Sequence, residues 1–227
     1  MRSNLVLLIA VIFAMSGFSC KQRGGKYIDQ GEIHFNIEYV GSFGSVPKEV
    51  LPQNLIVSFK KDKILFEMTG FGKSGILNLS NPDKGYYDTY FSVFTNRFYY
   101  AGKLGEVYPG FETMKGMTLK KTAKTSIICG YNCKNAEVTF PSKGDKIYEV
   151  WYTNEIKVKN PNASTPFNQI DGVLMNFFFF LGPAELHFNA ENVFSKQVPD
   201  ETFDRREKFK RVTKEEIAKF IDNMISI

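Results

Sequence analysis

Hydrophobic and polar residues alternate with a period of two along much of the chain. In residues 32–39 every second position is isoleucine, phenylalanine or tyrosine, and the positions between them are polar. Because successive side chains of a strand point to opposite faces, this pattern predicts a strand with one wet face. Further strands are predicted as a hairpin within 54–70, before the turn at 81–82, and at 134–140, 146–154, 172–181 and 185–193.

Turn residues recur about every ten positions, and no segment before residue 200 has a convincing helical period. Aromatic residues make up 15% of the chain, which agrees with a protein built from sheets. The predicted fold class is therefore mainly β. We expect a curved antiparallel sheet or an incompletely closed β-barrel.

The C-terminal segment has a helical pattern instead. Thr213 and Glu216 form a T-x-x-E capping box, and Val212 and Ile217 have the spacing of a hydrophobic staple. One apolar stripe follows, made of Ile217, Phe220, Ile221, Met224 and Ile225. The pattern predicts an amphipathic helix over about 213–226 that packs its apolar stripe on the sheet.

Two segments follow neither pattern. Residues 106–126 mix glycine, methionine and lysine, and we expect a loop with at most one helical turn. Residues 200–211 carry charges of alternating sign, which is typical of a solvated segment leading into the final helix.

Four consecutive phenylalanines, Phe177–Phe180, raise the question of a membrane span. The apolar run Val173–Leu181 is too short for a membrane helix. In a strand these four side chains would make both faces apolar, so we predict a central strand with the core on one side and the C-terminal helix or a ligand on the other. The candidate apolar face or pocket consists of Phe177, Phe178, Phe179, Phe180, Trp151, Ile217, Phe220, Ile221 and Met224. The alternative is that these aromatics fill a solid core.

The first twenty residues have the pattern of an export signal. Arg2 is the only charge before position 21, and the apolar run Leu5–Met15 ends in small residues before Cys20. As a helix this run would be about 17 Å long, well short of a hydrocarbon core of about 30 Å. A cysteine at this point resembles the lipobox of bacterial lipoproteins, although Gly17 stands where leucine is usual. The alternative is a plain secretory signal with an incidental cysteine.

These patterns divide the chain. Residues 1–19 are predicted to be the signal peptide, 20–30 the lipidated Cys20 with a tether, and 31–227 a single domain.

Two further cysteines, Cys129 and Cys133, form a disulfide candidate because an even pair outside the cytoplasm is usually bonded. The residues between them suit a tight hairpin that would bring the two side chains together. The alternative is two half-buried thiols. A C-x3-C spacing with no nearby histidine does not suggest a metal site, and none is predicted.

Sequence motifs of catalysis are missing. The chain contains no G-x-S-x-G, no H-E-x-x-H and no glycine-rich phosphate loop. Its two histidines, His34 and His187, occupy strand positions typical of structural residues on a wet face. The net charge of +5 is spread along the chain, whereas a nucleic-acid site needs clustered positive charge. We therefore predict a protein that is not an enzyme, with no cofactor and no nucleic-acid partner.

Three blocks in the second half of the chain resemble one known family. The blocks are Ile128 with Gly130–Ala136, Trp151–Ile156 and Gln169–Met175. In this order they look like the GLPGLI family of Bacteroidetes envelope proteins, over roughly residues 120–212. Gly172 matches the motif that names the family, whereas Asp171 replaces its proline. The resemblance implies no firmly assigned activity. The pattern of a sheet followed by a helix is similar, by analogy, to the lipoprotein carriers LolA and LolB.

Two functions follow from these features. The first is an outer-membrane lipoprotein that faces the periplasm, is held to the membrane through Cys20, and binds an apolar ligand (a lipid, acyl chain or lipopeptide) between sheet and helix. The second is an accessory subunit of an envelope protein complex without a small ligand. Its interface anchors would be exposed tyrosines, namely Tyr86, Tyr87, Tyr99 and Tyr100. An enzyme with an unrecognised site ranks third.

Overall fold

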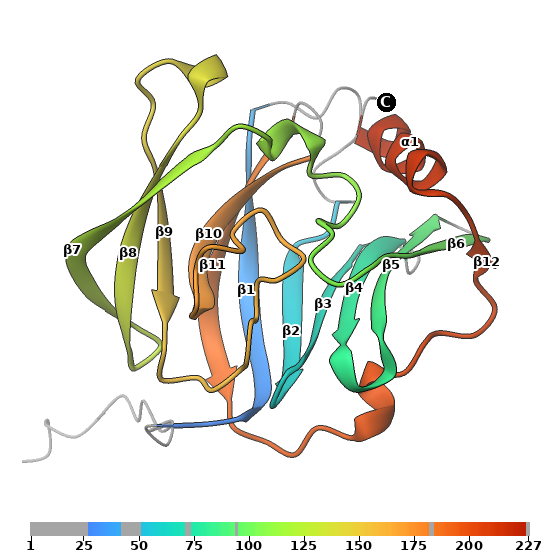
Figure 1. The fold of residues 1–227 in the computed structure, drawn as a ribbon, viewed down its shortest axis with the longest axis horizontal. Helices are drawn as coiled ribbons and strands as arrows, with labels where there is room; N and C mark the ends of the chain where they lie inside the picture. The colour runs from blue at the N-terminus through green and yellow to red at the C-terminus, as the bar shows by residue number, and fades with distance from the viewer. Residues whose placement is uncertain (1–26, 42–50, 71–73, 94, 182–183, 226–227) are drawn as a thin grey trace, which may run out of the picture.

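The computed structural model describes residues 27–41, 51–70, 74–93, 95–181 and 184–225, and this part of the chain forms one strongly curved sheet with an α-helix at its end (Figure 1). The predicted signal peptide and Cys20 lie outside the described residues. The strands are β1 (Gln30–Val40), β2 (Asn54–Lys60), β3 (Lys63–Thr69), β4 (Gly75–Asn81), β5 (Tyr86–Val93), β6 (Asn96–Ala101), β7 (Thr118–Ile128), β8 (Tyr131–Thr139), β9 (Tyr148–Thr153), β10 (Val173–Leu181), β11 (Ala184–Phe194) and β12 (Lys210–Arg211). Short 3-10 helices are η3 (Pro82–Lys84), η4 (Glu112–Met114), η5 (Pro141–Lys143) and η6 (Asp200–Phe203), and α1 (Lys214–Ile225) follows β12.

The first strand lies in the middle of the sheet. The strand order is β12-β6-β5-β4-β3-β2-β1-β11-β10-β9-β8-β7, and neighbours are antiparallel except that β12 runs parallel to β6. One wing is therefore a meander of β2–β6, and the other is a meander of β7–β11. In the described chain the edge strands β7 and β12 do not pair with each other, so the sheet is curved but unclosed. The predicted mainly β fold class is confirmed.

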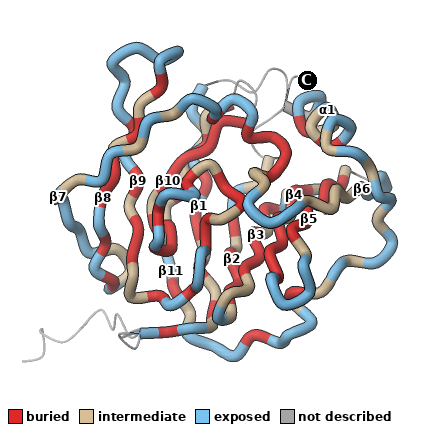
Figure 2. Tube along the Cα trace, viewed as in Figure 1, coloured by how far each residue is buried: buried red, intermediate tan, exposed pale blue. Residues whose placement is uncertain are grey.

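Most of the core lies between the sheet and two long loops. We call the face of the sheet that carries Phe35, Phe66 and Phe177 the inner face. The loop 102–117, between β6 and β7, and the loop 154–172, between β9 and β10, both lie over it (Figure 1). Buried residues run along the middle strands and continue into both loops (Figure 2). The loops thus act as a second layer on the sheet.

The opposite face of β3–β5 is covered by residues 195–211, which we call the strap. Val198 and Phe203 of the strap pack on Leu65, Leu79 and Tyr90 to form a second, smaller apolar cluster. This cluster explains why so many strand residues of this wing are buried on both faces.

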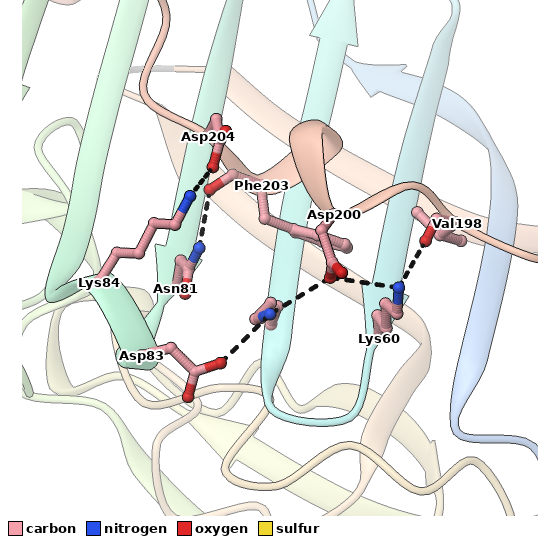
Figure 3. Close-up of polar contacts among 9 residues, drawn as sticks. Lys60, Asn81, Asp83, Lys84, Val198, Asp200, Phe203 and Asp204 are labelled. Atoms are coloured by element: carbon pink, nitrogen blue, oxygen red, sulfur yellow. Dashed lines mark hydrogen bonds and ion pairs between the residues drawn. The ribbon is translucent and has the colours of Figure 1, made fainter.

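Polar groups along the strap bind the ends of the strands beneath it (Figure 3). The ammonium group of Lys60 donates to the carbonyl oxygen of Val198 at 3.0 Å, and the side-chain amide of Asn81 donates to that of Phe203 at 2.9 Å. The carboxylate of Asp200 lies 3.1 Å from the ammonium group of Lys60. Carbonyl groups of the strap are therefore satisfied by the sheet it covers.

An ion pair between a buried aspartate and an exposed arginine holds the strap further along. The guanidinium of Arg205 donates to both carboxylate oxygens of Asp88, from Nε at 2.6 Å and from Nη2 at 2.9 Å. Asp88 is wholly buried and also accepts from the hydroxyl of Tyr90. These hydrogen bonds raise the pKa of Arg205 above its ordinary value, so this side chain stays charged. Most of residues 200–211 are exposed, as predicted for a solvated segment, but Phe203 and Arg205 fasten the segment to the sheet.

The predicted C-terminal helix begins with the predicted cap. The backbone nitrogen of Thr213 donates to the Glu216 carboxylate at 2.8 Å, and that of Glu216 donates to the Thr213 hydroxyl at 3.2 Å. Ile217 and Ile221 are fully buried. The ring of Phe220 stacks on Phe98 of β6, with 4.4 Å between ring centroids. The described part of the apolar stripe, Ile217, Phe220 and Ile221, therefore packs on the sheet, with Phe220 at the β5–β6 end.

The segment 106–126 is only partly a loop. It contains η4, as the single helical turn predicted, but β7 begins at Thr118 and forms the edge of the sheet. The domain also begins before residue 31, because Ile28 is buried and forms a bridge with Ile156.

Candidate functional site

The inner face of β10 carries two of the four phenylalanines. Phe177 stacks on Phe188 of β11, with 4.8 Å between ring centroids. Phe179 contacts Phe111 of the loop 102–117, with 4.3 Å between centroids. The residue that covers Phe179 is therefore on a loop, and the loops rather than α1 form most of the layer over this part of β10.

The other two phenylalanines fill a gap between two strands. β10 pairs with β9 only as far as Asn176, and beyond that point the two strands separate. Phe178 stacks on Tyr148 of β9 at 4.6 Å, and Phe180 packs edge-on against Phe140 at 5.3 Å. All four phenylalanines are at least 94% buried, so both faces of β10 are dry.

The structure brings together only part of the predicted apolar face. Trp151 is half-buried and pairs in register with Asn135 and Asn176, apart from the inner-face phenylalanines. Phe220 packs on β6 instead of β10, whereas Ile221 lies against Gly110 of the loop over Phe179. The side chain of Met224 lies outside the described residues.

A small apolar cavity lies between the inner face and the loop 102–117, and we call it the inner pocket. Its volume is about 40 Å³. The lining consists of Leu55, Phe66, Met68, Ile76, Asn78, Tyr108, Pro109, Phe111, Thr165, Phe179, Leu181 and Phe188. None of these side chains is charged, and they come from both wings and both loops. A space of this size holds about one water molecule, so a larger ligand would have to widen it.

A second cavity, the loop cavity, lies next to the inner pocket and has a volume of about 270 Å³. It is lined by Val107, Tyr108, Phe111, Glu112, Met114, Lys115, Gly116, Met117, Pro166, Gln169 and Lys214. Tyr108 and Phe111 line both cavities and so form the wall between them. The loop cavity is more polar and includes two lysines.

The loop 102–117 is fastened to the first residue of α1. The ammonium group of Lys214 donates to Glu106 at 2.8 Å and to the carbonyl oxygen of Val107 at 3.1 Å. Partial burial would raise the pKa of Glu106, but hydrogen bonds from Lys214 and Tyr100 outweigh it, and the pKa is lowered. Glu106 is therefore ionised at neutral pH and keeps this contact.

The apolar lining of the inner pocket includes one side-chain amide, that of Asn78. Asn78 of β4 sits in register between Phe66 of β3 and Thr89 of β5, and it is only 9% exposed. Its side-chain oxygen accepts a hydrogen bond from the Thr89 hydroxyl at 2.9 Å. Sequence reasoning missed Asn78. The available indication was the pattern of β4, in which Ile76 and Asn78 alternate with leucines.

Cys129 and Cys133 are free thiols, so the expected disulfide is not present. The hairpin does form, but Cys129 and Gly130 are its two turn residues, and Cys133 pairs with Ser126 on the opposite strand. The two cysteines therefore do not face each other. Burial raises the pKa of the Cys133 thiol to about 12, so this thiol is unreactive at neutral pH.

Both histidines lie on strands beside a glutamate two residues away. His34 is 3.2 Å from Glu32, and His187 is 2.7 Å from Glu185. Each is half-buried on the face opposite the inner pocket. Across the described residues no three histidine, cysteine, aspartate or glutamate side chains cluster closely enough to hold a metal ion.

No α-helix in the described ranges is long and apolar enough to cross a membrane. No model of a known family and no curated protein matches the chain, so the family suggested by the three blocks has no support beyond them.

Solved structures do match. A crystal structure of a protein named PNGF-II in space group P21 is similar over 86% of this chain, with a TM-score of 0.54 and 18% identity. Its C2 crystal form gives a TM-score of 0.51, also at 18% identity and over 86% of this chain. This chain spans only about a third of PNGF-II, 34% and 32% in the two forms, and the likeness shows a shared fold alone. LprF from Mycobacterium bovis aligns over 78% of this chain and 89% of its own, at 9% identity and a TM-score of 0.28, which is too low to compare folds.

Proposed function

We propose that this chain is a non-enzymatic module of the bacterial cell envelope that binds an apolar ligand, such as a lipid, acyl chain or lipopeptide, between the inner face and the loop 102–117. One observation carries the proposal. An uncharged, apolar pocket lined from both wings of the sheet lies beside a larger cavity, and Tyr108 and Phe111 line both.

The wall explains how a small pocket becomes a binding site. Ligand pockets have volumes of roughly 300–1,000 Å³, and the two cavities together reach the lower end of that range once Phe111 swings aside. Exposing a buried phenylalanine costs about 1.5–3 kcal/mol, whereas each buried methylene group of a ligand contributes about 0.8 kcal/mol. Two to four methylene groups therefore offset the movement of Phe111. An acyl chain carries more than that.

Binding is tested with the full chain carrying Cys20→Ser, which removes the lipidation site and leaves the described residues unchanged. We expect a lipid to co-purify and be visible by native mass spectrometry, and the neutral dye N-phenyl-1-naphthylamine to bind with enhanced fluorescence. The variant Ile76→Phe places a ring in the inner pocket and should weaken dye binding at least about tenfold.

The matched control is Leu77→Phe, which adds the same ring at the next position, on the opposite face of β4. It should bind dye as the parent does. The proposal fails if the parent chain retains no lipid and binds no dye, or if Ile76→Phe binds dye as well as Leu77→Phe.

The location is proposed from the N-terminal sequence. We place the protein at the outer membrane, facing the periplasm and anchored through a diacylglycerated Cys20. Mass spectrometry of the mature N-terminus is expected to begin at Cys20 with the mass of the attached lipid. An unmodified cysteine or a different first residue would contradict the anchor.

The alternative is an accessory subunit of an envelope complex. The four tyrosines expected as its interface anchors are less exposed than the sequence suggested. Tyr87 is buried, Tyr86 and Tyr99 both lie against the guanidinium of Arg205, and Tyr100 donates to Glu106. Crosslinking in the envelope that captured one stoichiometric partner, together with an empty pocket, would favour this function.

A further inference from the structure

We propose, building on the function above, that the inner pocket selects apolar chains that carry an uncharged hydrogen-bond acceptor. The acceptor is the carbonyl oxygen of an ester, amide or ketone, and the side-chain amide nitrogen of Asn78 donates to it.

The first step is the position of the amide. Asn78 lines the inner pocket, and its oxygen is already engaged by the Thr89 hydroxyl at 2.9 Å. Among the described residues its nitrogen, Nδ2, has no hydrogen-bond partner. An amide donor that lines a pocket without a protein acceptor is available to a ligand, and a ligand carbonyl would accept from it.

The second step concerns the other polar side chains of the lining. The hydroxyl of Thr165 donates to the carbonyl oxygen of Asn162 at 3.1 Å and accepts from the backbone nitrogen of Phe167 at 3.2 Å. The hydroxyl of Tyr108 lies close to the side chains of Ser164 and Ser80. Asn78 is the lining residue that brings a side-chain amide donor to the pocket.

The third step excludes a charged acceptor. No lining side chain of the inner pocket is charged; the two lysines nearby, Lys115 and Lys214, line the loop cavity instead, and Lys214 is bonded to Glu106. Burying a carboxylate without a cation is far more costly than burying a carbonyl group. The pocket therefore favours neutral carbonyl ligands over fatty-acid anions.

The test uses three probes of equal chain length: undecane, 2-undecanone and undecanoate. Each displaces N-phenyl-1-naphthylamine from the full chain carrying Cys20→Ser, and from the same chain with Asn78→Leu. We expect Asn78→Leu to lower the affinity for 2-undecanone by about 3- to 10-fold. The affinity for undecane should stay the same or increase. Comparing each probe with itself removes differences in water solubility. Undecanoate should bind less tightly than 2-undecanone.

Asn135 provides a matched control. It is fully buried, its side-chain oxygen accepts from the Thr122 hydroxyl at 2.8 Å as that of Asn78 does from Thr89, and its nitrogen has no partner in the described chain, yet it does not line the inner pocket. Asn135→Leu should leave the ratio of ketone to alkane binding unchanged.

A second measurement needs no variant and so does not depend on Asn78→Leu folding. The probe is 2-undecanone labelled with ¹³C at its carbonyl. Its infrared carbonyl stretch should have a lower frequency in the bound state than in an alkane solvent, because the bound carbonyl accepts a hydrogen bond. An unshifted stretch, an unchanged ratio in Asn78→Leu, or tighter binding of undecanoate would each overturn the inference while leaving apolar binding intact. Failure of the dye itself to bind would overturn both.

Discussion

At the residue scale, Gly172 fixes how closely two strands approach. A Cβ atom at this position would lie 2.6 Å from the ring of Tyr152 and 2.7 Å from the carbonyl oxygen of Thr153. The carbonyl oxygen of Gly172 also accepts from the buried side chain of Asn162 at 2.9 Å. The glycine therefore lets the loop 154–172 enter β10 directly against β9.

We expect Gly172→Ala to lower the free energy of unfolding by about 1–3 kcal/mol, because the methyl group displaces the backbone of β9. Denaturant unfolding measures the loss. The adjacent Asp171→Ala, at a side chain that is 86% exposed, should change stability by less than about 0.5 kcal/mol. Equal effects of the two substitutions would mean that the backbone of β9 can move away from the added methyl group without lowering the free energy of unfolding.

Glu185 makes stability depend on pH. Partial burial would raise its pKa, but hydrogen bonds from His187 and Lys146 outweigh it and lower the pKa below the ordinary value of 4.5. A carboxyl group with a lowered pKa contributes stability that is fully present above about pH 4.5 and is lost as the pH falls through the lowered value.

Glu185→Gln should therefore show a shallower fall of stability than the parent between about pH 5 and pH 3. Thermal unfolding across this range measures the slope. Glu38→Gln, at an exposed position of β1, is the control and should keep the slope of the parent. If Glu185→Gln also keeps the slope of the parent, the loss of stability at low pH arises from other groups.

At the residue scale, the sequence predicted which side chains are buried better than which face of the sheet they point to. The dryness of Phe177–Phe180 follows from their type and spacing alone. Asn78 does not, because alternation within β4 suggests that Leu77 and Leu79 face the main core. The strap supplies a second apolar environment on the opposite face. Leu77 and Leu79 therefore pack against the strap cluster, and Asn78 faces the inner pocket. A contact from 120 residues away cannot be read from a local pattern.

At the scale of elements, α1 depends on its first turn. The reciprocal hydrogen bonds of Thr213 and Glu216 satisfy backbone donors that the helix itself leaves free. Thr213→Ala should destabilise the helix by about 1 kcal/mol.

Hydrogen exchange of the backbone amides measures this effect. In Thr213→Ala the amides of α1 should lose more protection than those of the sheet. Lys219→Ala, at an exposed position of the same helix, is the control. Protection that fell equally in α1 and in the central strands would show that the cap supports the whole domain instead.

The two elements that sequence reasoning misplaced have physical causes. β7 is an edge strand whose residues are mostly exposed on both faces, so its lysines and threonines show no alternation. In the β7–β8 hairpin, Cys129 and Gly130 both have positive φ, 51° and 82°, which suits a two-residue turn. That turn places Cys133 opposite Ser126, three positions before Cys129, so the register that a disulfide between Cys129 and Cys133 requires does not form.

At the scale of the whole molecule, the strap ties the end of the chain to the first wing. Its main contact is the buried Asp88 with Arg205. Arg205→Leu leaves a fully buried carboxylate without its cation, and the free energy of unfolding should fall by about 3–5 kcal/mol.

Limited proteolysis within the strap and denaturant unfolding report on this variant together. Lys84→Ala removes an exposed ion pair to Asp204 in the same strap and should lower stability far less than Arg205→Leu. Similar losses in both variants would indicate that the apolar cluster under the strap, rather than the ion pair, holds it.

The position of β1 has a kinetic consequence. The first strand of the domain is central, and its second neighbour, β11, begins more than 140 residues after β1 ends. The first wing can form as a local meander, but β1 keeps one unpaired edge until the whole second wing has been made. Sheets closed by such distant pairing fold slowly, and an open central edge is a template for mispairing between chains. The refolding yield should therefore fall with protein concentration, and a chaperone that covers extended strands should restore it.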